Sequence, residues 1–153
     1  MTAEDQLDQI TDAAKILGLK TEVIEVPAVQ ELEKAFKLAQ QKKAGAILFM
    51  SSPVFYVNRK HVASLARAAK LPGITGMSQI AEEGILLSYG NDVDAIYRRT
   101  GYYLDRILKG TAPRDLPVEQ VTILTLTANF KTAKALGIKF PESILVRVDK
   151  AVR

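Results

Sequence analysis

The sequence predicts an α/β fold built on a parallel sheet. Segments with the pattern of strands alternate with amphipathic helical segments and are joined by short loops, which is typical of parallel strands linked by right-handed crossovers. The continuous apolar run Ala46 to Met50 has the length and composition of a strand covered by helices on both faces. Of the 153 residues, 48% are hydrophobic and 25% are charged, as in one ordinary globular domain.

The first third of the chain reads as helix, strand and helix. Apolar residues recur at helical spacing from Leu7 to Leu17, and Thr2 and Gly18 are placed to begin and end this helix. The mostly alternating segment Thr21 to Val26 predicts a half-buried strand. A second helix carries an apolar face of Leu32, Phe36 and Ala39 and closes near Lys42.

The middle third continues the alternation. After the core strand Ala46 to Met50, Asn58 is placed to cap a helix with the buried stripe Val62, Leu65, Ala66 and Ala69. Two further strands are expected at Pro72 to Gly76 and at Ile85 to Tyr89, separated by a short helix from Ser78 to Glu83.

The last third begins with a long helix from Asp92 to Lys109, which Gly110 ends. We expect its residues Ile96, Tyr103, Ile107 and Leu108 to face inward. The proline-containing linker from Thr111 to Pro117 leads to a strand over Glu119 to Thr127, which is rich in β-branched residues. Two helices follow: Lys131 to Leu136, capped by Asn129 and stopped by Gly137, and a final helix from Pro141 that bears Ile144, Leu145, Val148 and Ala151.

Composition excludes several classes of function. The chain has no cysteine and a single histidine, His61, so disulfide frameworks, thiolate or multi-histidine metal sites and thiol nucleophiles are excluded. No glycine-rich dinucleotide fingerprint or phosphate loop is present. Although the net charge is +4, the cations are dispersed in short pairs, which indicates a solvated surface rather than a nucleic-acid interface. We therefore expect no cofactor, no metal and no nucleic-acid partner.

The loops that follow the strands are the places to look for a ligand, because open parallel sheets bind ligands beyond the carboxyl ends of their strands. Hydroxyl groups and rings follow the core strand, and a capping serine and a tyrosine follow the next two strands. In each loop these residues could instead serve the turn or the packing alone. The candidate ligand-binding residues are Ser51, Ser52, Pro53, Phe55, Met77, Ser78 and Tyr89. Gly90 is expected to allow a turn with positive φ after Tyr89.

Several stretches, in their order and spacing, resemble the C-terminal half of the substrate-binding proteins of bacterial ABC transporters. They are Asn58-Arg59 after the core strand, Ile85-Leu86-Leu87-Ser88-Tyr89-Gly90, Tyr97-Arg98-Arg99, Tyr103-Leu104-Asp105-Arg106-Ile107-Leu108-Lys109-Gly110, Leu116-Pro117-Val118-Glu119-Gln120, and Lys131-Thr132-Ala133-Lys134-Ala135-Leu136-Gly137-Ile138. The resemblance implies a Rossmann-like lobe of a type I periplasmic-binding-protein fold, without the other lobe. Residues 1–110 would form the lobe, and residues 111–153 would supply a linker, a strand and C-terminal helices that return to the lobe or cross to a partner.

The same resemblance implies capture of a small organic solute, such as an amino acid, and delivery to a membrane permease, without catalysis. By position, the cleft-facing loops of the family fall on Ser51-Ser52-Pro53, Gly76-Met77-Ser78 and Tyr89-Gly90. Relatives work in the periplasm or otherwise outside the cytoplasm, whereas this chain starts without the pattern of a signal peptide and has no run long enough to cross a bilayer. An effector-sensing domain of a transcription regulator, which shares this fold, is the alternative. A small α/β enzyme would need a reactive constellation that the sequence does not offer.

The assembly expectation follows from strand order. In the flavodoxin-like order the first strand lies inside the sheet, between the second and third, and no strand pattern precedes the opening helix. An unfilled place there would leave backbone groups unpaired, at a cost of about 1 to 3 kcal/mol for each buried group. We therefore expect a homodimer in which the strand Glu119 to Thr127 or the exposed sheet edge takes part.

Overall fold

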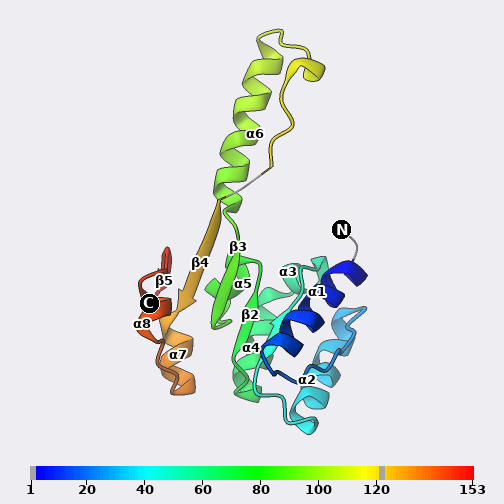
Figure 1. The fold of residues 1–153 in the computed structure, drawn as a ribbon, viewed down its shortest axis with the longest axis vertical. Helices are drawn as coiled ribbons and strands as arrows, with labels where there is room; N and C mark the ends of the chain where they lie inside the picture. The colour runs from blue at the N-terminus through cyan, green and yellow to red at the C-terminus, as the bar shows by residue number, and fades with distance from the viewer. Residues whose placement is uncertain (1–2, 121–122) are drawn as a thin grey trace.

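The computed structural model describes residues 3–120 and 123–153 and contains a five-stranded sheet with helices packed against it (Figure 1). The strands are β1 (Ile47–Phe49), β2 (Gly73–Thr75), β3 (Leu87–Asn91), β4 (Leu124–Asn129) and β5 (Lys150–Val152). The α-helices are α1 (Ala3–Ile16), α2 (Leu32–Gln41), α3 (Pro53–Val57), α4 (Arg59–Ala69), α5 (Ser78–Glu83), α6 (Val93–Leu108), α7 (Phe130–Leu136) and α8 (Glu142–Leu145). Two short 3-10 helices, η1 (Val29–Glu31) and η2 (Pro113–Asp115), precede α2 and follow α6.

The sheet order is β1-β2-β3-β4-β5, and the sheet is mostly parallel. β1, β2 and β3 are parallel neighbours, as are β4 and β5. The exception is β4, which pairs antiparallel with β3, with Ser88 opposite Thr127. The predicted α/β class is confirmed. The expectation of a wholly parallel sheet is wrong at β4, because the chain leaves the sheet after β3 through α6 and re-enters from the same edge.

The core lies between β1 to β3 and the helices α2, α4 and α5. Phe49 of β1 stands at its centre, with ring centroids 6.2 Å from Phe36 of α2 and 5.6 Å from Phe55 of α3. Burial of such side chains provides the main favourable free energy of folding. The buried members of this cluster are Leu32, Phe36, Phe49, Val62, Ala66, Ile80 and Ile85, and the expected helix faces supply them.

Most of the predicted helix ends are confirmed. Gly18, Gly110 and Gly137 follow α1, α6 and α7 with φ of +67°, +94° and +69°, which only glycine adopts without strain. The side chain of Asp92 accepts a hydrogen bond from the Ala95 amide at 2.9 Å, and Asn129 accepts one from Thr132 at 2.9 Å. The expected cap Thr2 lies outside the described residues.

Two predicted caps are wrong in their chemistry. Asn58 does precede α4, but its side-chain amide donates to the carbonyl of Val54 at 2.8 Å instead of accepting from α4. Here the preceding helix α3 ends on the same residue and competes for its side chain. Ser78 is the first helical residue of α5, and the extended Met77 takes the capping position without a side-chain bond.

The predicted strand Thr21 to Val26 is wrong, because this segment has no strand pairing. In the flavodoxin-like order a strand at this point of the chain pairs with one that lies next to β1. Within residues 3–120 and 123–153, β1 is the edge of the sheet and no strand lies on its outer side. The segment instead contacts the second helix through the Glu22 carboxylate, which pairs with the Lys42 ammonium at 2.8 Å.

The C-terminal segment also departs from expectation. The helix α8 spans only Glu142–Leu145, and Ala151 lies in the strand β5 instead. This part of the chain forms a strand because the outer edge of β4 is open to pairing. The Leu126 amide donates to the Asp149 carboxylate and the Asp149 amide donates to the Leu126 carbonyl, which aligns the chain for parallel pairing. The strand expected over Glu119 to Thr127 is β4, which begins at Leu124; positions 121 and 122 lie outside the described residues.

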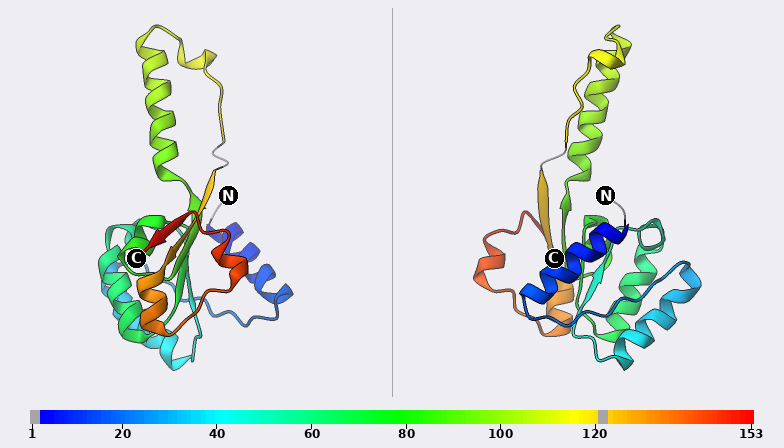
Figure 2. Two further views of the ribbon diagram at one scale, coloured as in Figure 1. Left: turned by 90° about the vertical axis from the view of Figure 1, so that its left-hand side faces the viewer. Right: turned by 45° about the vertical axis from the view of Figure 1, so that its right-hand side comes forward.

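Helix α6 and the chain that follows it form an arm that projects away from the sheet (Figures 1 and 2). None of the residues of α6, all of which the structure describes, is buried. The expectation that its apolar residues Ile96, Tyr103, Ile107 and Leu108 face inward is therefore wrong, since the helix lies against its own return segment and not against the lobe. None of the helices within the described residues is long and apolar enough to cross a membrane.

Candidate ligand-binding site

Three loops meet at one edge of the sheet. Because β1, β2 and β3 run parallel, their carboxyl ends lie at the same edge. From this edge rises α6, directly after β3 (Figure 1). Ser51 lies in the loop after β1, the loop after β2 begins at Gly76, and Tyr89 and Gly90 lie inside β3, just past the point where β2 ends opposite Ser88. The fold therefore brings the predicted segments of the site to one place.

The backbone contact between Gly76 and Gly90 sets the distance between two of these segments. A β-carbon on Gly90 would stand 2.0 Å from the carbonyl oxygen of Gly76 and 2.8 Å from its carbonyl carbon. No side chain fits there. Gly90 lies inside β3 and does not have a positive φ. The expected turn is thus wrong, and the glycine serves a close approach of two backbones instead.

Ser51 closes the other side of Gly76. A β-carbon on Gly76 would lie 3.4 Å from the Ser51 hydroxyl oxygen and 3.9 Å from the Tyr89 carbonyl oxygen. Ser51 is exposed, and its hydroxyl is a donor and an acceptor. Ser51, Gly76 and the backbone of Tyr89 thus lie close together and offer one hydroxyl beside backbone carbonyl groups.

The rest of the first loop has a mainly structural arrangement. The Ser52 hydroxyl accepts a hydrogen bond from the Val54 amide at 3.3 Å and so caps α3, with the exposed Pro53 at its first position. Phe55 is half-buried and its ring meets Phe49 edge to face. These three candidates hold the loop against the core, which leaves Ser51 as the member of this loop exposed to solvent beside Gly76.

The second loop is fixed by a residue that the sequence analysis did not single out. Thr75 is buried at the end of β2, and its hydroxyl accepts a hydrogen bond from the Met77 amide at 3.3 Å. Met77 packs partly against the core cluster, and Ser78 is half-buried at the start of α5. A threonine followed by Gly76 was the available signal, because a hydroxyl two residues before an amide favours a local turn.

The expectation that the strand ends at Tyr89 is wrong, because β3 continues to Asn91 by pairing with β4; Tyr89 is its central residue, with 47% of its surface exposed. It pairs in register with Leu126 of β4, so it lies where the sheet meets the base of the arm. A ring with a polar hydroxyl in such a position offers both an apolar face and a hydrogen bond to a ligand.

Charge near the first loop is already paired. The Arg59 guanidinium lies 3.3 Å from the Glu83 carboxylate and 5.6 Å from the ring centre of Tyr56. Both charged groups remain partly exposed, so the pair is a weak tie between α4 and α5. A ligand beside Ser51 would therefore contact hydroxyl and backbone groups and not a cluster of unpaired charges.

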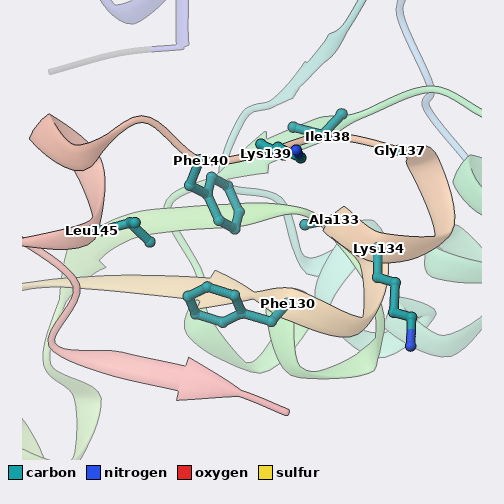
Figure 3. A pocket seen from close by; sticks show the side chains of 8 residues that line it. All are labelled: Phe130, Ala133, Lys134, Gly137, Ile138, Lys139, Phe140 and Leu145. Carbon is teal, nitrogen blue, oxygen red and sulfur yellow. The ribbon is translucent and has the colours of Figure 1, made fainter.

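A hollow lies at the opposite end of the strands from the predicted loops. Its volume is about 460 Å³, and Phe130 and Phe140 line it with ring centroids 5.3 Å apart (Figure 3). Because β4 runs antiparallel to β3, the start of α7 lies opposite the edge that holds Ser51 and Gly76. This hollow is therefore remote from the predicted loops and contains none of the predicted site residues.

Comparison with solved structures supports the fold assignment. The chain is similar to a conserved domain protein from Vibrio cholerae, with 23% identity and a TM-score of 0.82 over 97% of this chain and 50% of that one. An ABC domain from Streptococcus pneumoniae, solved in complex with L-Trp, has 26% identity and a TM-score of 0.83 over 98% of this chain and 52% of that one. A ligand-free, open substrate-binding protein with adhesive properties from Clostridium difficile has 21% identity and a TM-score of 0.68, over 99% and 50%.

The chain thus spans about half the length of these three structures. Among curated proteins, the sequence search finds no match. A family model, that of the ABC transporter substrate binding protein, matches residues 2–152, which is nearly the whole sequence. The resemblance noted in the sequence is confirmed by this match and by the fold. The chain belongs to the family of ABC transporter substrate-binding proteins.

Proposed function

We propose that this chain is a solute-binding lobe of an ABC transporter and that it captures a small organic solute, such as an amino acid. The observation that carries the proposal is the meeting of Ser51 and Gly76, which follow β1 and β2, with Tyr89 of the neighbouring strand β3, in a chain of this family. The complex of the Streptococcus pneumoniae neighbour with L-Trp supports an amino acid as the class of solute.

The site suits a solute with one polar end and one apolar part. The Ser51 hydroxyl and the backbone around Gly76 provide hydrogen bonds, and Tyr89 provides a ring. Binding and release need no covalent step, so the proposed role is capture without catalysis. We place this role outside the cytoplasm, with a membrane permease as the recipient of the solute.

We also propose a division of the chain near Gly110. Residues 1–110 hold the three loops of the site, whereas residues 111–153 return from the arm to the sheet and add β4 and β5. A second copy of the chain is the proposed partner in assembly. In this division the site belongs to residues 1–110, and of the two expected dimer contacts the exposed sheet edge at β1 is the one we propose, because β4 already pairs with β3 and β5.

Isothermal titration calorimetry against L-tryptophan, other amino acids and small carboxylates tests the proposed function. Ser51→Ala removes the exposed hydroxyl and is expected to weaken binding by about 5- to 10-fold, as for one hydrogen bond of roughly 1 kcal/mol. Tyr89→Ala is expected to weaken it by at least as much.

The matched control is Ser143→Ala, which removes an exposed hydroxyl from α8 and leaves the three loops intact. It should bind like the unmodified chain. If no solute of the panel binds, or if Ser51→Ala and Tyr89→Ala bind as tightly as the unmodified chain, the proposed site is wrong.

A further inference from the structure

The hollow beside α7 is a built feature of the fold that the proposed solute site does not use (Figure 3). Every residue that lines it lies between Phe130 and Leu145, so one continuous stretch of the described chain forms it. Helix α7 is fixed at both ends: Asn129 caps it through the Thr132 amide, and Gly137 ends it with a φ of +69°, which turns the chain back over the helix. The hollow is therefore preformed in the folded chain.

The wall of the hollow is apolar. The rings of Phe130 and Phe140 meet edge to face at 80°, and both side chains are only half-buried. Leu145 of α8 extends the wall and has 44% of its surface exposed. Apolar side chains that stay open on a concave surface are well suited to receive the anchor side chain of a partner.

The charged side chains of the lining are both lysines. Lys134 lies on α7 and Lys139 on the chain that follows it, and both are exposed. No acidic residue lines the hollow. Within residues 3–120 and 123–153, neither ammonium group has an ion-pair partner. The hollow thus offers two unpaired positive charges beside an apolar wall.

The excess positive charge of the chain is concentrated in this part of the sequence. Residues 130–153 carry six basic side chains and two acidic ones, whereas residues 1–129 carry 15 of each. The net charge of +4 therefore comes entirely from the segment that builds the hollow and the strand after it. A local excess of one sign attracts a partner of the opposite sign and speeds its encounter.

We infer that the hollow docks an acidic segment of a partner protein, which places one aromatic or branched apolar side chain against the two phenylalanine rings and its carboxylates beside Lys134 and Lys139. The concave shape favours a peptide over a membrane surface, because insertion into a bilayer needs apolar side chains that protrude. The apolar wall favours a peptide over a nucleic acid, whose phosphates need a row of cations.

This docking site is separate from the proposed solute site. The hollow lies at the end of the strands opposite to the loops after β1 and β2, and also opposite to the arm (Figure 1). Peptide docking and solute binding can therefore succeed or fail independently, and the inference goes beyond the proposed function without depending on it.

Fluorescence anisotropy with a labelled synthetic peptide tests the docking. The probe is a short peptide of aspartates and glutamates with one central phenylalanine. One control peptide replaces the phenylalanine with serine, and the other replaces the acidic residues with lysines. The full chain is expected to bind the probe and to bind each control at least about 10-fold more weakly. Absence of binding, or equal binding of the serine control, would overturn the inference.

Two substitutions on α8 separate the hollow from its surroundings. Leu145→Glu and Val146→Glu introduce the same charge at neighbouring exposed positions, and of the two residues Leu145 lines the hollow. Leu145→Glu is expected to weaken binding of the probe by about 10-fold or more. The matched control Val146→Glu is expected to weaken it by about 2-fold, through its charge alone. Similar losses in the two variants would contradict docking in the hollow.

A pair of charge reversals tests the role of the lysines. The double variant of Lys134→Glu and Lys139→Glu is expected to weaken binding of the probe by about 10-fold or more. Its matched control combines Lys37→Glu and Lys60→Glu, which reverse two exposed charges on α2 and α4, and should lose less than about 3-fold. Equal losses would show that only the net charge matters and would overturn the inference. Circular dichroism checks the folding of each variant.

Chemical shifts of the unmodified chain decide the question even if a variant fails to fold. The probe peptide is expected to shift the amide signals of Phe130, Lys134 and Phe140 and to leave those of Ser51 and Gly76 in place. The reverse pattern would overturn the inference. Binding to vesicles of an anionic phospholipid, with loss in Leu145→Glu and without binding of the probe, would assign the hollow to a membrane surface and would also overturn it.

These outcomes separate the inference from the proposed function. A chain that docks the probe peptide in the hollow and binds no solute contradicts the proposed function and keeps the docking site. A chain that binds a solute with dependence on Ser51 and does not bind the probe keeps the function and contradicts the docking site.

Discussion

The carbonyl oxygen of Gly76 occupies the place where a side chain on Gly90 would begin, at 2.0 Å from an ideal β-carbon. This contact ties the loop after β2 to the end of β3, and Ser51 joins it from the loop after β1. The candidate site is therefore held by backbone packing between strand ends, and its shape depends on two glycines more than on any charged group.

Gly90→Ala is expected to destabilise the fold by about 3 kcal/mol, the upper range for forcing extra volume into a packed place, because a backbone carbonyl cannot move aside as a flexible side chain would. Urea unfolding measures the change. Gly45→Ala is the control, since open space surrounds that position. Equal stabilities of the two variants would show that the contact between Gly76 and Gly90 is not tight.

Asn129→Ala is expected to cost about 2 to 3 kcal/mol. The side chain of Asn129 caps α7 through Thr132, and its amide donates to the buried carbonyl of Ala81 at 2.8 Å. Asn129→Ser retains a capping oxygen but loses the amide that donates to Ala81. Its free energy of unfolding should therefore lie between those of the native chain and Asn129→Ala. If Asn129→Ser were as stable as the native chain in urea unfolding, the bond to Ala81 would have no role.

Thr127→Val is expected to leave stability unchanged or to raise it by up to about 1 kcal/mol. The hydroxyls of Thr127 and Ser88 are buried on paired strands, and neither has a hydrogen-bond partner within the part of the chain that the structure describes. Thr132→Val is the matched control, because the Thr132 hydroxyl donates to Gly84 at 2.9 Å. Thermal unfolding should show a lower midpoint temperature for Thr132→Val and not for Thr127→Val. A clearly lower midpoint for Thr127→Val would contradict the prediction.

The arm hairpin is expected to loosen in acid. Hydrogen bonds from Arg99 lower the pKa of the Glu119 carboxyl below its ordinary value of 4.5. Because the folded pKa is the lower one, the contribution of this pair is present above pH 4.5 and is lost as the pH falls through the folded pKa. Protection factors of the Tyr103 and Val118 amides, which correct for the pH dependence of intrinsic exchange, should therefore fall as the pH drops below 4.5. Glu119→Gln removes the titrating carboxyl, so amide protection in the arm should no longer change with pH over this range. If the protection of Glu119→Gln still falls in acid as in the native chain, other groups cause the effect.

The parts of the fold that local pattern determines were predictable from the sequence. The core strand ending at Phe49, the capping of α6 by Asp92 and of α7 by Asn129, and the glycine stops all depend on neighbouring residues in the chain. The wrong predictions, a strand at Thr21 to Val26 and an inward face of α6, concern features that depend on distant parts of the chain packing against them. A strand pattern needs a partner strand, and an apolar helix face shows only that something covers it.

The site shows the same limit. Strand-end geometry located the three loops, because it follows from parallel pairing alone. It did not reveal that Gly90 serves an approach to Gly76 instead of a turn, or that Thr75 fixes the loop after β2. The first feature depends on the register between β2 and β3, which the sequence pattern does not specify, whereas the bond between Thr75 and the Met77 amide is local and its signal was present in the sequence.

Chemical-shift mapping by NMR, with labelled chain titrated with L-tryptophan and then with a panel of amino acids, tests the central claim most directly. The account predicts that at least one solute shifts the amide signals of Ser51, Gly76, Met77 and Tyr89. The signals of Phe130 and Phe140, at the opposite end of the strands, should stay in place. Absence of any shift across the panel, or shifts confined to the hollow between Phe130 and Phe140, would contradict it.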